Sequence, residues 1–194
     1  MSTKPQVLLR EVLPFFLGLA ALLLTTLLVD ALLHLIDAVW IGRYLGIPGV
    51  LLILASFGHS LRKRGILKSG DPVRLLHLHE GLAWTGSLLV LVHAGIHFNA
   101  VLAWLAVVAM LINIVSGLTG KYLLRRAQTR LKAARTELKA EGVSDPEVSA
   151  RLHNDSLAVD VMRAWRKVHL PIALVFAILA LAHVSAIFVL WGWK

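Results

Sequence analysis

The chain has 194 residues, of which 58% are hydrophobic and only 16% are charged. Its mean hydropathy of +0.76 exceeds what a soluble core of this length requires, so the composition indicates a membrane protein. It carries a formal net charge of +9 and no cysteine, which excludes disulfides, thiolate-held iron–sulfur clusters and covalently attached c-type haem.

Five apolar stretches follow one another along the chain. Four reach the roughly 20 residues that a membrane span requires. The second, "LGIPGVLLILASFGHSL", is shorter and predicts either an untilted span or one that starts from an interfacial turn at Pro48-Gly49. We therefore expect an all-α integral membrane protein, a bundle of five transmembrane helices forming a single membrane domain over residues 1–194. The expected spans are residues 12–36, 45–61, 77–98, 101–123 and 168–191.

The basic residues predict the orientation of these spans. With five spans and the N-terminus inside, 18 of the 20 Lys and Arg residues lie on the cytoplasmic side. The positive-inside rule therefore favours a cytoplasmic N-terminus and an external C-terminus, in a multi-pass protein of a prokaryotic cytoplasmic membrane. This placement explains the net charge through contact with membrane lipid, so we expect no nucleic acid as a partner.

Residues 124–167 form the one sizeable polar insertion, between the fourth and fifth spans. "LLRRAQTRLKAARTELKAEG" consists of helix formers with a leucine stripe and ends on Gly142, a suitable C-cap. "SDPE" then reads as a helix start, with Ser144 or Asp145 as the cap and Pro146 in the first turn. We expect a cytoplasmic helical hairpin.

Four histidines make two matched pairs within the spans. His79 and His93 are 14 residues apart in the third span, as are His169 and His183 in the fifth. Fourteen residues fall about 40° short of four helical turns, so each pair lies on nearly one face, about 21 Å apart along the axis. The third and fifth spans run in the same direction, which places His79 and His169 near the inside and His93 and His183 nearer the outside.

Two imidazole pairs at two depths fit two haems, each held by one histidine from each helix. Neutral imidazole suits iron, so we expect two non-covalent b haems with bis-histidine ligation, the inner on His79 and His169 and the outer on His93 and His183. The alternatives are structural or proton-relay histidines.

Several neighbouring residues are candidates for contacts with these haems. Arg166 and Lys167 are suited to the propionates of the inner haem, or to anchoring at the interface. Three glycines of the third span leave room for a macrocycle between helices, or they simply allow close helix packing. These glycines are Gly81, Gly86 and Gly95.

His97 and Glu80 flank the two histidines of the third span. His97 lies one turn after His93 and is a candidate to replace it as a ligand, to contact a propionate or to bind quinol. Glu80 sits just inside the membrane, where a carboxylate is costly unless it is paired or protonated, so it is a candidate for a quinone or propionate site. His59 is expected at the interface.

The histidine pattern resembles that of membrane dihaem b-type cytochromes. "WRKVHLPIALVFAILALAHVSAIFVLW" and "HEGLAWTGSLLVLVHAGIHF" are similar to the two ligand helices of the ferric-reductase-like transmembrane domain. The resemblance covers about residues 75–190 and implies electron transfer across the bilayer through two b haems, with the ligand pairs named above. Two features depart from that family. Its reductases usually carry a flavin and nicotinamide domain, which residues 1–194 do not contain, and the polar insertion of residues 124–167 has no counterpart in the family.

The function expected from these features is that of a dihaem cytochrome b subunit. It would carry electrons between a quinone or quinol pool and a redox partner subunit with clusters, flavin or c-type haem, so it would serve an oxidoreductase complex without being a complete enzyme. One alternative is a free-standing transmembrane reductase of ferric iron or oxygen. Another is a histidine-lined proton or metal transporter, and a third is a membrane anchor with incidental histidines.

Overall fold

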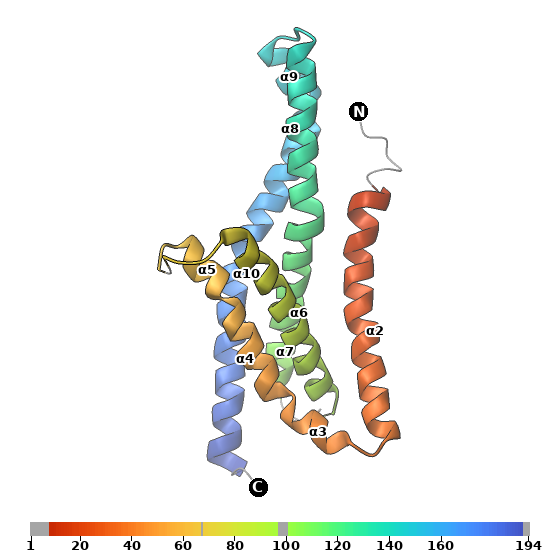
Figure 1. Cartoon of the computed structure of the whole chain (residues 1–194), viewed down its shortest axis with the longest axis vertical. Coiled ribbons are helices and arrows are strands. Elements are labelled where there is room, and N and C mark those ends of the chain that lie inside the picture. The colour runs from red at the N-terminus through yellow and green to blue at the C-terminus, as the bar shows by residue number, and fades with distance from the viewer. Residues whose placement is uncertain (1–7, 67, 97–100, 192–194) are drawn as a thin grey trace. The chain divides into compact units, whose positions relative to one another are not determined.

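A computed structural model describes residues 8–66, 68–96 and 101–191, and these are mostly helical with no strand among them (Figure 1). Five helical segments are long and apolar enough to cross a membrane, which confirms the expected number of spans and indicates a multi-pass membrane protein. These segments are Leu9–Leu35, Val39–Arg62, Pro72–Gly95, Val101–Ala140 and His153–Leu190.

The segments are built from nine α-helices and three short π-helical turns over the described residues. The α-helices are α2 Leu13–Leu35, α3 Val39–Tyr44, α4 Gly46–Ser56, α5 Gly58–Lys63, α6 Pro72–Ile96, α7 Val101–Leu118, α8 Arg125–Ala140, α9 Asp145–Arg151 and α10 His153–Ala186. The π-helical turns are Leu8–Val12, Thr119–Leu124 and Ile187–Trp191.

The second span differs from its expected form. The chain is helical from Val39, so the span has 24 residues and is no longer short. Pro48 lies in the first turn of α4, where its missing N–H is harmless, so of the two alternatives the interfacial turn at Pro48-Gly49 was wrong. The interruptions instead fall at Leu45 and Phe57, between α3, α4 and α5.

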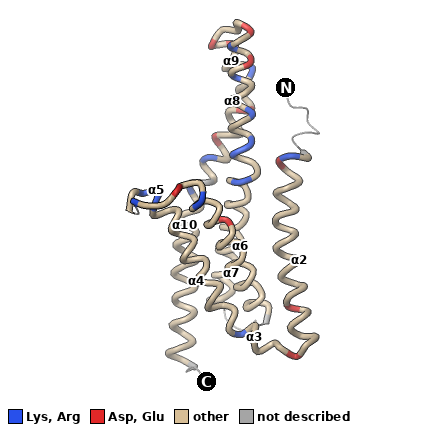
Figure 2. Tube along the Cα trace, viewed as in Figure 1, with Lys and Arg blue, Asp and Glu red and all other residues tan. Residues whose placement is uncertain are grey.

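Large apolar side chains cover the outside of these helices. Leu28 of α2 is 70% exposed and Leu181 of α10 is 68% exposed. Exposure of this extent is unfavourable in water but suits a surface solvated by lipid. Figure 2 shows that the Lys and Arg residues gather elsewhere, along α8, on the first part of α10 and around the connection from α5 to α6.

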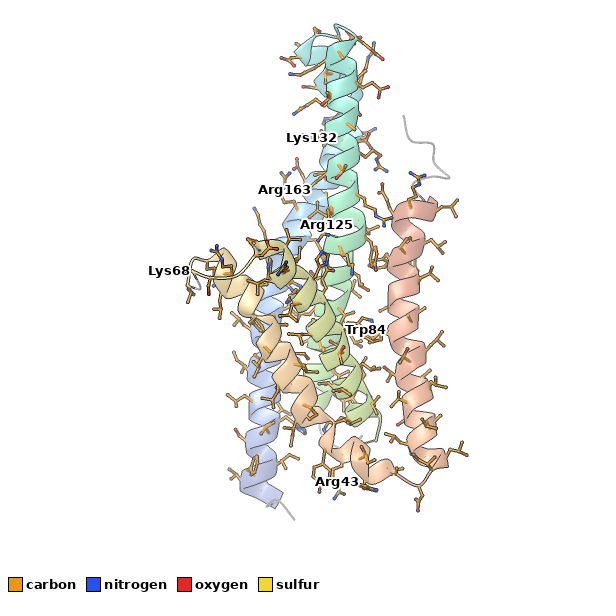
Figure 3. The ribbon with its side chains drawn as sticks, in the orientation of Figure 1. Arg43, Lys68, Trp84, Arg125, Lys132 and Arg163 are labelled. Carbon is orange, nitrogen blue, oxygen red and sulfur yellow. The ribbon has the colours of Figure 1, made fainter. Side chains whose placement is uncertain are left out.

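The chain divides into two compact units. The first consists of residues 1–20 and 111–174. Within it, α8 and the π-helical turn before it pack on the first part of α10 through a buried cluster of Leu124, Ala127 and Val159. Arg125 and Lys132 of α8 and Arg163 of α10, labelled in Figure 3, are exposed.

The ends of the helices in this unit follow their sequence signals. Gly142 takes the left-handed conformation with a φ of 79°, as expected of a residue that ends a helix. Ser144 is the extended N-cap of α9, although its side chain makes no capping hydrogen bond, and Pro146 lies in the first turn. At the start of the chain, Glu11 and Arg130 form an ion pair of 2.8 Å between Oε1 and Nη1.

The second unit consists of residues 21–110 and 175–194. Its most extensive helix packing joins α4 and α6, which lie side by side (Figure 1). At their closest approach, a Cβ on Gly86 would lie 2.7 Å from the carbonyl oxygen of Gly49. This glycine pair lets the two backbones meet, as small residues do in membrane helix packing.

Candidate functional site

The four matched histidines lie on two long helices. His79 and His93 are on α6, and His169 and His183 are on α10. All four side chains are partly buried. Each helix continues without a break between its two histidines, so the expected 14-residue spacing within one helix is present in both.

His79 is held by the end of α4. Its Nδ1 lies 3.0 Å from the carbonyl oxygen of Ser56, the last residue of that helix. Ser56 is buried, and its hydroxyl donates to the carbonyl oxygen of Ile53 over 2.6 Å. The ring of His59, from α5, lies with its centroid 5.9 Å from that of His79. His59, expected only at an interface, is therefore a direct neighbour of a candidate ligand.

His93 is held in a corresponding way by the start of the second span. Its Nδ1 lies 3.2 Å from the carbonyl oxygen of Gly42 in α3. The ring also lies directly against Gly46, where an added Cβ would be 2.8 Å from Cδ2 and 3.1 Å from Nε2. Only glycine at this position leaves the ring where it is.

These contacts determine which ring nitrogen carries the proton. A carbonyl oxygen only accepts hydrogen bonds, so Nδ1 is the donor in both His79 and His93. In a neutral imidazole the lone pair is then on Nε2. Histidines that bind metals commonly have this arrangement, with the other ring N–H donated to a backbone carbonyl. The two side chains therefore have the hydrogen bonding of metal ligands.

The partners expected for these histidines lie on α10. His183 belongs to the same unit as His93, whereas His169 belongs to the other unit. Pro171 lies inside α10, two residues after His169, and its missing N–H leaves the carbonyl of Lys167 without an intrahelical donor. The pairing of His79 with His169 and of His93 with His183 stays a prediction.

The residues expected to contact propionates or a quinone are only partly described by the structure. Glu80 is 18% exposed, and its Oε2 lies 3.9 Å from Nδ1 of His77. Lys167 is exposed on α10. His97 and the side chain of Arg166 lie outside the described part of the chain. Their suggested contacts with propionates or a quinone stay predictions.

The three glycines of α6 have different surroundings. Gly86 meets the backbone of α4, so helix packing accounts for it. At Gly95 a Cβ would come within 3.7 Å of Oδ1 of Asp30. At Gly81 a Cβ would meet no described atom within 4 Å, so this glycine alone has open space beside it among the three.

The contribution of the second span was not expected from the sequence. Small residues recur along the second span at spacings of four, three and seven, so they lie on one face of a helix. These residues are Gly42, Gly46, Gly49 and Ser56. This stripe could have indicated the face that packs on the third span. Which backbone carbonyls meet the histidines depends on how the second span packs on α6.

No protein-family model, curated protein or solved structure matches this chain. The resemblance to dihaem cytochromes therefore rests on the histidine spacing and the quoted helices alone, and it stays a prediction.

Proposed function

We propose that this protein is a dihaem cytochrome b subunit that carries electrons across the membrane between a quinone pool and a partner redox protein. The observation that carries the proposal is the hydrogen bonding of His79 and His93. Both place the ring proton on Nδ1, against a backbone carbonyl, and the lone pair on Nε2. A second helix, α10, carries His169 and His183 at the same spacing.

The donor set suits haem iron. His79 and His169 would hold an inner b haem, and His93 and His183 an outer one, in each case through imidazole nitrogens alone. Each b haem would supply a one-electron iron couple, which suits electron transfer. The carbonyl oxygens of Ser56 and Gly42 orient the α6 imidazoles and increase their basicity.

Other residues of the chain supply the surroundings of these ligands. Arg166 and Lys167 are proposed to hold the propionates next to His169. Glu80 and His97 are the candidates for quinone or propionate contacts, because each is within four residues of a proposed ligand histidine in the sequence. Gly81 offers space for a flat group beside α6, since a Cβ there would meet no described atom.

The proposed orientation has the N-terminus inside and the C-terminus outside a prokaryotic cytoplasmic membrane. Residues 124–167 then form a helical hairpin on the cytoplasmic side, where their excess of Lys and Arg satisfies the positive-inside rule. This basic surface is a suitable docking site for a partner subunit that carries clusters, flavin or c-type haem.

The test is a reduced-minus-oxidised visible spectrum of the purified full-length chain, with a pyridine haemochrome assay for haem per polypeptide. Two b haems per chain are expected from a haem-replete preparation. Absence of haem from a folded, haem-replete preparation would overturn the proposal and favour a histidine-lined transporter. Quinol-driven reduction of the bound haem then separates a quinone-linked subunit from a free-standing reductase.

A further inference from the structure

The second and third spans meet in a regular antiparallel register. His79 contacts Ser56, Gly86 contacts Gly49, and His93 contacts Gly42. The contact points are therefore spaced by seven residues on each helix, and their order along α6 is the reverse of their order along the second span. The two acceptor carbonyls are 14 residues apart, like the two histidines, and the glycine crossing lies midway between them.

The breaks in the second span explain why these carbonyls accept from a side chain. α3 ends at Tyr44 and α4 ends at Ser56, so Gly42 and Ser56 both lie in the last turn of a helix. The last carbonyls of a helix have no donor four residues further along that helix. The carbonyl oxygen of Gly42 accepts from the N–H of Leu45 over 3.3 Å, and its second lone pair is left for His93. Inside a membrane an unsatisfied carbonyl is costly, and interrupted helices persist where another group satisfies it.

We propose that the interrupted second span is a shared positioning element for both haem sites. Through the carbonyls of Gly42 and Ser56 it holds His93 and His79 in the form protonated at Nδ1, with Nε2 turned to the metal. This inference rests on the proposed dihaem function and adds that one helix pair, locked at Gly49 and Gly86, sets the ligand chemistry of both sites.

Substitutions of the glycines in the second span can perturb one haem site or both. A Cβ at position 46 would lie 2.8 Å from the ring of His93 and would displace it from Gly42. A Cβ at position 49 would lie 2.9 Å from the carbonyl oxygen of Gly86 and would separate α4 from α6. Gly46→Ala should therefore affect the outer site alone, and Gly49→Ala should affect both.

The effect on the metal has a definite direction. A hydrogen bond from Nδ1 to a carbonyl makes the imidazole a stronger donor through Nε2, which favours oxidised iron. Loss of that bond should raise the midpoint potential of the haem and weaken its binding by about 10- to 100-fold. A purely structural role of Gly46 would lower stability without this selective shift.

The first experiment reads the tautomers directly by ¹⁵N NMR of histidine-labelled, reduced, full-length protein. The signals are assigned by their loss in His79→Gln and His93→Gln. A proton on Nδ1 in both residues is expected, whereas a proton on Nε2 in either would overturn the inference. This measurement needs no haem, so it tests the tautomers of His79 and His93 even if the chain binds none.

The second experiment is a redox titration of Gly46→Ala, with Gly58→Ala as the matched control. Gly58 lies in the same span, and a Cβ there would meet no described atom within 4 Å. We expect Gly46→Ala to raise the potential, or lower the occupancy, of the haem that His93→Ala removes, and Gly58→Ala to change neither haem. Unchanged haems in Gly46→Ala would overturn this inference, whereas a chain without haem would overturn the proposed function instead.

Discussion

Gly49 of α4 and Gly86 of α6 approach so closely that a Cβ on either would lie within 3 Å of the other's carbonyl oxygen. The contact is between two backbones, so neither neighbour can move aside by changing a rotamer. The crossing stands seven residues from His79 and seven from His93, and therefore sets the distance of both rings from the second span.

Replacement of Gly86 by alanine should destabilise the protein. The new Cβ would lie 2.7 Å from the carbonyl oxygen of Gly49, and overpacking of this kind costs about 1–3 kcal/mol. Denaturation followed by far-UV circular dichroism measures the change. Gly81→Ala is the matched control on the same helix, because its Cβ meets no described atom within 4 Å and alanine has the higher helix propensity. Equal loss of stability in both variants would contradict the prediction.

Each proposed ligand should be necessary for one haem. His183→Ala should reduce the pyridine haemochrome value from two haems per chain to one, because the proposed outer haem would lose one of its two imidazole ligands and the chain has no cysteine to replace it. His153→Ala is the control, since His153 is an exposed residue at the first position of the same helix. Retention of two haems in His183→Ala would remove this histidine from the ligand set.

The orientation is testable because the chain has no native cysteine. Single cysteines at Ile36, Ser69 and Glu141 can each be labelled in intact cells with a maleimide that does not cross membranes. We expect labelling at position 36 alone, since the positive-inside rule places positions 69 and 141 in the cytoplasm. All three should react after permeabilisation. Labelling of position 141 in intact cells would reverse the proposed orientation.

The ion pair between Glu11 and Arg130 should contribute measurably to stability. The two side chains are only 12% and 28% exposed, so water screens their 2.8 Å contact less than it screens a surface pair. A double-mutant cycle with Glu11→Gln and Arg130→Met should give a coupling of about 1 kcal/mol in thermal unfolding. The pair Glu147 and Arg151 is half-exposed and should give about 0.5 kcal/mol or less. A coupling no larger at Glu11 than at Glu147 would contradict this account.

The ion pair in the connection from α8 to α9 should be lost at low pH, when Asp145 is protonated. Asp145 Oδ1 lies 2.8 Å from Nζ of Lys139, whose hydrogen bond and charge hold the pKa of Asp145 below its ordinary value. A pKa lowered in the folded state means that the contact stabilises the connection above about pH 4 and is lost as the pH falls through the lowered pKa. An NMR titration of the Asp145 carboxyl should show a midpoint that rises in Lys139→Met. An unchanged midpoint would contradict the assigned cause.

The number and approximate position of the spans could be predicted because four of them are long apolar runs, and such runs are recognisable without any partner. The local signals at Gly142 and Ser144 were equally readable, since each acts within one or two turns of its own helix. The second span was the weakest prediction. Its breaks fall at Leu45 and Phe57, each directly before a glycine, and a glycine alone does not indicate where a helix is interrupted.

By itself, the sequence determined that this is a helical membrane protein with five spans, and that two helices carry histidines four turns apart. Helical periodicity and the hydrophobic effect require nothing beyond the chain itself for those conclusions. The tertiary structure decided which nitrogen of His79 and of His93 carries the proton, because the acceptors come from Ser56 and Gly42, 23 and 51 residues away in the sequence. A hydrogen bond depends on a few tenths of an ångström between two helices, and only their packing at Gly49 and Gly86 supplies that distance.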